Sequence, residues 1–286
     1  MFITDTLQAM LPSTPQLRSL TFEASYNCRD RMLSSQHAIR PWILLEQWNA
    51  TLHAVKSALQ TLVISVEFYN GDCTFFKQPD IKPQFSGRLD LRGFDQLHSL
   101  EIPAPLLTSE TMSILMNTNY LQYAPPQLRH LTLRTDMTGA QLVYPYGTSS
   151  QELKKESRVR DKARMELTCI SQLSLSLVEQ LPFLQSLAIW QPPDPSLDFF
   201  DDELQELHNF CKNKSITAKV LYPMLLRRKS PLYWNLVHEV TLFDASYPES
   251  GSVVHIFQGE RQGTPLGLAS QYHLAEFKKH YIRRNR

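Results

Sequence analysis

The chain has little of what several protein classes require. It contains nine glycines and four cysteines in 286 residues, and its formal net charge is only +1. Doubly wound enzymes usually carry a glycine-rich turn at the phosphate site, and no GxGxxG, GxxxxGK[ST] or GxSxG sequence occurs. A balanced charge gives no general attraction for nucleic acid or for an anionic membrane. We therefore expect neither of these partners.

Close pairs of metal-binding residues are also missing. The cysteines Cys28, Cys73, Cys169 and Cys211 form no CxxC pair, and the nine histidines form no HExxH spacing. A disulfide framework or a zinc ribbon needs closer pairs. We expect reduced thiols that pack as small hydrophobic side chains, with no cofactor and no metal.

Long apolar runs are absent as well. The first residues, MFITDTLQAMLPSTPQ, have neither the basic start nor the apolar core of a secretory signal. No stretch approaches the ~18–20 apolar residues of a membrane span. These observations predict an intracellular protein, cytoplasmic or nuclear, without a membrane partner.

What the chain does contain is one seven-residue pattern written five times. The pattern is x-Leu-x-x-Leu-x-apolar, and the two residues between the leucines are polar in every copy. Its last two anchors are two residues apart and therefore point to the same face of a strand. The copies are QLRSLTF (16–22), ALQTLVI (58–64), QLHSLEI (96–102), QLRHLTL (127–133) and FLQSLAI (183–189).

The repeated pattern predicts how its copies assemble. A lone short strand cannot stably bury its apolar face, whereas copies stacked side by side can, as parallel strands joined by helical crossovers. Helical periodicity over residues 42–59 and 201–210, and a degenerate sixth strand at 216–222, support this order. We predict an α/β fold, an irregular leucine-rich-repeat-like solenoid with parallel strands on the concave face and helices on the convex face. The alternative is an ordinary α/β domain with leucine-rich strands.

Spacing and composition predict the boundaries. The copies are roughly thirty to fifty-five residues apart, longer than in compact leucine-rich repeats. We expect the solenoid over 1–222, with a charged insert near 136–170 in which 151–167 forms a solvated helix or a mobile segment. Residues 223–286 are expected to form a C-terminal cap, a hairpin of HEVTLF and VVHIF followed by a basic amphipathic helix.

Two phrases, FDQLHSLEIPAPLLTS and APPQLRHLTLRTDM, carry a family resemblance. The residues Leu100-Glu101-Ile102-Pro103 and Ala124-Pro125-Pro126-Gln127-Leu128 resemble the leucine-rich regions of fungal F-box-type proteins. There a strand ending in Leu-Glu-Ile-Pro precedes a helix and then a Leu-Pro-Pro-x-Leu-x-x-Leu-x-Leu strand. The resemblance runs over about residues 10–222 and implies a substrate-recognition arm of a cullin–RING ubiquitin ligase. No F-box, the family's adaptor-binding segment, is found before the first copy.

The outward residues of each strand are the candidate binding residues. Trp and Arg are enriched at interface hot spots, so Arg134 and Trp190 are our first choices, although Trp190 could instead pack under QPPDPS (191–196). The sequence predicts a non-enzymatic scaffold that recognises a protein partner or a ubiquitination substrate. The alternatives are an F-box-type ligase whose F-box is missing or upstream, and an enzyme on an unrecognised fold. The full candidate set is Glu23, Ser65, Glu101, Thr132, Arg134, Trp190 and Lys219.

Overall fold

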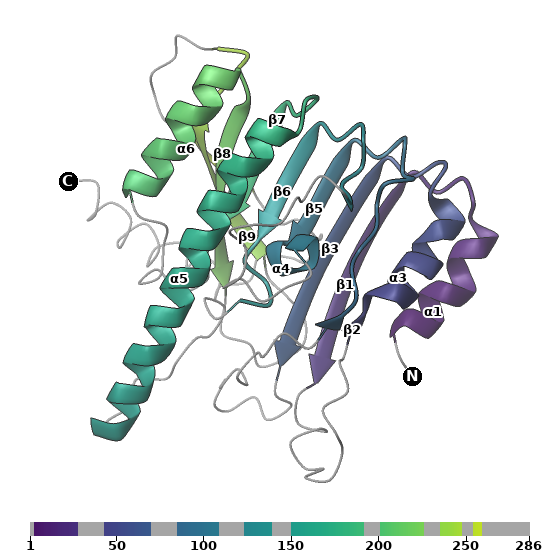
Figure 1. The fold of residues 1–286 in the computed structure, drawn as a ribbon, viewed down its shortest axis with the longest axis horizontal. Coiled ribbons are helices and arrows are strands. Elements are labelled where there is room, and N and C mark those ends of the chain that lie inside the picture. Colours follow the sequence, from purple (N-terminus) through teal and green to yellow (C-terminus); the bar gives the residue numbers. More distant parts are fainter. Residues whose placement is uncertain are drawn as a thin grey trace.

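The computed structural model describes residues 3–27, 43–69, 85–108, 123–138, 150–191, 201–225, 235–247 and 254–258. In these ranges the structure is mixed α/β, with a mostly parallel sheet and helices (Figure 1). A separate two-stranded parallel pair joins β2 (Ile43–Leu44) to β4 (Phe85–Ser86). The main sheet has eight strands, which are in spatial order β1 (Ser19–Asn27), β3 (Thr61–Tyr69), β5 (Ser99–Pro103), β6 (His130–Arg134), β7 (Ser186–Trp190), β8 (Thr217–Leu225), β9 (Asn235–Phe243) and β10 (Val254–Gln258).

The sheet keeps the order of the sequence, and its first six strands are parallel. The register aligns the second leucine of all five copies, which are Leu20, Leu62, Leu100, Leu131 and Leu187. The sixth strand continues the row with Ala218. The prediction that the five copies are neighbouring parallel strands is therefore confirmed.

A repeated backbone hydrogen-bond pattern joins the strand starts. The carbonyl of Arg18 accepts bonds from the N–H groups of both Gln60 and Thr61, at 2.7 and 2.9 Å. The carbonyls of Gln60, His98 and Arg129 each accept two N–H groups from the next strand in the same way. One carbonyl thus fixes two consecutive residues of its neighbour at four successive junctions.

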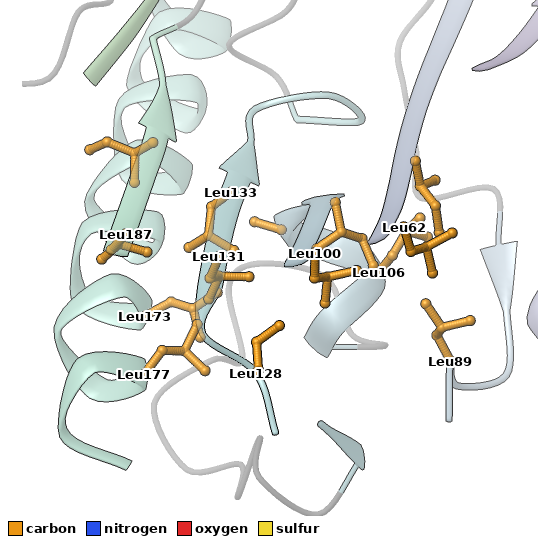
Figure 2. Packing of buried hydrophobic residues seen from close by; sticks show 14 of the residues in the cluster. Leu62, Leu89, Leu100, Leu106, Leu128, Leu131, Leu133, Leu173, Leu177 and Leu187 are labelled. Carbon is orange, nitrogen blue, oxygen red and sulfur yellow. The ribbon is translucent and has the colours of Figure 1, made fainter. Parts of the chain in front are cut away.

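The helices supply the second layer of the core. Buried side chains from them belong to the same apolar cluster as the strand leucines. Figure 2 shows Leu106 and Leu173, from two different helices, with Leu100, Leu131 and Leu187 of the sheet in this layer. No helix of the described ranges is long and apolar enough to cross a membrane. The helices are α1 (Ile3–Met10), α3 (Leu45–Leu52), α4 (Ala104–Thr108), α5 (Ser150–Gln180) and α6 (Asp201–Lys214), with 3-10 turns η1 (Leu11–Ser13) and η2 (His53–Val55).

The charged stretch 151–167 lies in α5, a single helix of 31 residues. Its predicted helical form is observed, but the segment is not solvated throughout, because Ala163 and Leu167 are fully buried. These two and Ile170 follow one another at three- and four-residue steps and form part of an apolar stripe. The many charges conceal this stripe in the sequence. Of the predicted insert near 136–170, residues 139–149 lie outside the described ranges.

The C-terminal strands depart from parallel order. β9 pairs antiparallel with both β8 and β10, and the β9–β10 pair is the predicted hairpin. β8 runs through Leu225, past the predicted boundary at residue 222. The predicted C-terminal basic helix falls on residues outside the described ranges.

Candidate recognition surface

The residues between the buried anchors point to the opposite side of the sheet, which we call the polar face. On the six parallel strands they form three rows. The strand-start row is Ser19, Thr61, Ser99, His130, Ser186 and Thr217; the middle row is Thr21, Val63, Glu101, Thr132, Ala188 and Lys219; the strand-end row is Glu23, Ser65, Pro103, Arg134, Trp190 and Leu221. All seven predicted binding residues lie in the middle and strand-end rows.

The strand-end row is organised around Arg134. Its Nη1 donates to Oε1 of Glu101 at 2.6 Å, and its Nε donates to Oδ2 of Asp136, also at 2.6 Å. The guanidinium carbon lies 4.6 Å from the ring centroid of Trp190, a cation–π geometry. Only 14% of the Arg134 side chain is exposed, and 8% of each carboxylate partner. The two residues that we expected to contact a partner therefore contact each other.

Electrostatics keep this arginine charged. Burial by itself lowers the pKa of Arg134, but the attraction of Asp136 and then Glu101, with their hydrogen bonds, outweighs it and raises the pKa. Removing one partner of such a buried pair leaves a charge without compensation, which is strongly destabilising. We conclude that Arg134 holds β5 and β6 to the segment that follows β6.

Asp136 extends this bracing to a third strand. β3 and β5 pair only as far as Val63 and Glu101. Beyond that point Oδ2 of Asp136 accepts the N–H of Val66 on β3 at 3.1 Å. The carboxylate therefore satisfies a backbone donor where the strand ladder has ended, as buried donors require. Sequence reasoning missed Asp136 because it lies beyond the repeated pattern.

Trp190 and Lys219 also have partners within the chain. Trp190 is 4% exposed and packs with Leu221 and Ala188 in a small second apolar cluster on the polar face. Of the segment 191–196 proposed to cover Trp190, residues 192–196 lie outside the described ranges. Lys219 Nζ lies 2.7 Å from Oε1 of Glu239 on β9, a residue that the repeat pattern does not indicate.

The accessible part of the polar face is made of smaller side chains. Thr21 and Glu23 on β1 are exposed, and Ser65 and Thr132 are half-buried. These positions extend from β1 to β6 and surround the buried Glu101. Of the predicted set, therefore, Glu23, Ser65 and Thr132 are the more accessible members on β1, β3 and β6.

The strand-start row holds a pair that motif searching missed. Nδ1 of His130 and Oγ of Ser186 lie 2.8 Å apart and share a hydrogen bond. Partial burial of the ring lowers the pKa of His130, and the positive charges of Arg129, His98 and Lys219 lower it further. The two residues are 56 apart in sequence, so no local motif links them. Alignment of the five copies does, because both residues occupy the same position of the pattern.

The described ranges contain no candidate metal site, and their two cysteines are buried or half-buried thiols. No group of three or more His, Cys, Asp or Glu residues there could hold a metal ion. Burial raises the pKa of Cys211 to about 12, and burial followed by the charge of Glu166 raises that of Cys169. Both of these cysteines are free thiols. Cys28 and Cys73 lie outside the described ranges.

The candidate surface is thus a sheet face with a buried ion-paired cluster at Glu101, Arg134 and Asp136 and with more open positions on β1 and along the strand-start row. Its positions repeat once per strand because the five sequence copies lie in register. Comparisons with protein families, with curated proteins and with solved structures found no match for this chain.

Proposed function

We propose that this chain is a leucine-rich-repeat-like solenoid and that it recognises another protein through its polar face, without catalysing a reaction. The observation that carries the proposal is the in-register repeat. It places the outward residues of six parallel strands on one continuous face, while the leucines are committed to the core. Stacked repeats form extended binding surfaces of this kind.

The polar face combines an internally paired cluster with more accessible side chains, and this combination supports a role in binding. The cluster of Arg134, Glu101 and Asp136 is satisfied internally and gives the surface a rigid centre. The more accessible threonine and serine side chains around it can donate and accept hydrogen bonds to a partner without deep burial. A rigid surface loses little conformational entropy when it binds.

The test places bulky charges on the polar face without touching the core. Thr21→Arg and Thr132→Arg alter an exposed and a half-buried position of the middle row. Gln172→Arg, at an exposed position of α5, is the matched control on the helical layer. We expect purified full-length chain to lose a captured partner in the two sheet variants and to keep it in the control. Folded variants that all capture the same proteins equally would overturn the proposal.

A second proposal keeps a ubiquitin-ligase role. It is favoured by β5, which ends in Leu-Glu-Ile-Pro and is followed at once by α4, and by β6, which comes directly after Pro125-Pro126-Gln127-Leu128 and Arg129. This is the element order of the F-box-type leucine-rich regions that the sequence resembles. Reading the gene upstream of Met1 for an in-frame F-box tests it directly, and co-purification with the ligase adaptor tests it biochemically. A gene without an F-box and a chain that does not bind the adaptor would reject the ligase role.

A further inference from the structure

The edge of the sheet where the parallel strands begin collects basic side chains. It is the upper edge of the sheet in Figure 1. Two residues from each of the six strand starts lie there, four of them are basic, and none is acidic. The whole chain, by contrast, has 29 Lys and Arg residues and 9 His residues against 28 acidic ones. The twelve residues are Arg18, Ser19, Gln60, Thr61, His98, Ser99, Arg129, His130, Gln185, Ser186, Ile216 and Thr217.

The basic side chains are most closely spaced at β5 and β6. His98, Arg129 and His130 follow one another across this pair of strands, since the carbonyl of His98 accepts the N–H groups of both Arg129 and His130 at 2.8 Å. Hydroxyl groups of Ser99 and Ser186 occupy the neighbouring positions of the row. Basic groups and hydroxyl donors therefore converge on one stretch of the edge.

Three acidic groups lie near this stretch, and one of them is paired with a lysine. Lys219, which also faces His130, is paired with Glu239 at 2.7 Å. Asp244 follows β9 at the same edge, where its carboxylate accepts the N–H of Ser246 at 2.9 Å, and Asp95 is exposed in the turn before β5. The groups that perturb His130 are Arg129, His98 and Lys219, all of them basic. A local field of this sign attracts anions.

We propose that the strand-start edge of β5 to β7, formed by His98, Ser99, Arg129, His130 and Ser186, binds the phosphate group of a phosphorylated serine or threonine in the partner protein. This inference rests on the proposed function. A phosphate monoester carries about 1.5 to 2 negative charges and three acceptor oxygens. An arginine fork, imidazole N–H groups and hydroxyls are the donors that such a group requires.

Neighbouring residues favour a protein as the source of the phosphate. A nucleic-acid strand needs a continuous positive groove along its backbone. Here the carboxylates of Glu101 and Glu239 lie in the next part of the polar face, so the positive strip is narrow. Phe183 is 51% exposed in the turn before β7, and Tyr247 is 70% exposed in the turn after β9. Both turns border this edge and offer apolar contacts to the residues beside a phosphorylated side chain.

Binding at this edge is coupled to a proton. In the free protein, burial of the ring and then its positive neighbours lower the pKa of His130, and a phosphate dianion beside the ring opposes both effects by stabilising the imidazolium. Phosphate binding therefore raises the pKa of His130, and it tightens as the pH falls toward that pKa while the phosphate remains a dianion, above its second pKa of about 6. The groups that face the ring in the free protein are Arg129, His98, Lys219 and Ser186, and Lys219 is paired with Glu239.

The test follows the His130 ring by NMR in the full chain. The probes are N-acetyl-phosphoserine amide, its unphosphorylated form, inorganic phosphate and a single-stranded oligonucleotide. We expect a saturable shift of the His130 signals with the phosphoserine probe and none with its unphosphorylated form. Arg129→Gln removes a charge-assisted bond and is expected to weaken binding about tenfold or more. Lys162→Gln, which removes an exposed positive charge from α5, is the matched control and should bind as the wild type does.

Several results would overturn the inference. The proposed site is wrong if the phosphoserine probe does not shift the His130 signals, or if Lys162→Gln weakens binding of the probe as much as Arg129→Gln does. The assignment to a phosphorylated protein is wrong if the oligonucleotide binds more tightly than the phosphoserine probe, or if inorganic phosphate binds as tightly as that probe. If Thr21→Arg and Thr132→Arg release the partner but Arg129→Gln and phosphatase treatment of the partner do not, the phosphate site is wrong while the proposed function stands.

Discussion

Arg129 lies directly before the short strand β6 and Arg134 is its last residue, and the two arginines have opposite surroundings. Arg129 is exposed beside two histidines. Arg134 lies between two carboxylates and against an indole ring. The same side chain is thus available for binding at one end and is part of the structure at the other. Burial and the sign of the neighbouring charges, rather than residue type, decide which role an arginine takes.

The largest expected effect comes from breaking the strand-end cluster. Arg134→Met leaves Glu101 and Asp136 buried without their counter-charge, and we expect a loss of about 3–5 kcal/mol in the free energy of unfolding. Arg129→Gln, at the exposed end of the strand, should change it by no more than about 0.5 kcal/mol. Urea denaturation of both variants measures the difference. Equal effects would show that the two ends of β6 are not distinct.

The second comparison is between the middle and the edge of the core. Leu131 is 1% exposed between two strands, and Leu131→Ala should cost about 2–5 kcal/mol in the free energy of unfolding. Leu20 occupies the same row on the edge strand β1 but is only partly buried, so Leu20→Ala should cost less than half as much. Denaturation midpoints with unchanged slopes test this ordering. A larger loss at Leu20 would contradict the packing seen at β1.

The smallest effect concerns protonation at the strand-start edge. We expect NMR titration to give His130 a pKa below its usual value of about 6.5, and Arg129→Gln to raise that pKa by removing a positive neighbour. A folded pKa below the unfolded one means that protons favour the unfolded chain. The contribution of His130 to stability is therefore complete above the unfolded pKa and is lost as the pH falls below it. A His130 pKa above the usual value would contradict the positive surroundings.

The sequence predicted the sheet because its signal is local and repeated. Leu62, Leu100 and Leu131 each lie in a copy of the same pattern, which predicts a strand at each of them. Pairing within the sheet then places these strands side by side. Membership of the polar face followed from the two-residue period of a strand. Accessibility did not follow, since the burial of Glu101 and Trp190 depends on what packs above them.

Contacts from outside the repeat were beyond sequence reasoning. Asp136 reaches Val66, 70 residues earlier in the chain, and only the path of the segment after β6 brings them together. Lys219 meets Glu239 because β9 turns back against β8. The pair of His130 and Ser186 differs in kind, because aligning the copies at equal positions would have revealed it.

At four successive strand starts, two N–H groups bond to one carbonyl, and this makes the alignment of the strands independent of the length of the crossovers. These hydrogen bonds set the register between neighbouring strands locally, at the strand starts. The register therefore does not depend on the length of the crossover. Lengthening a crossover costs little entropy, about 0.6 kcal/mol for each doubling of a flexible loop. Insertions between strands are therefore tolerated without displacing any side chain of the sheet surface, and crossovers as unequal as those before β6 and before β7 can serve one uninterrupted array.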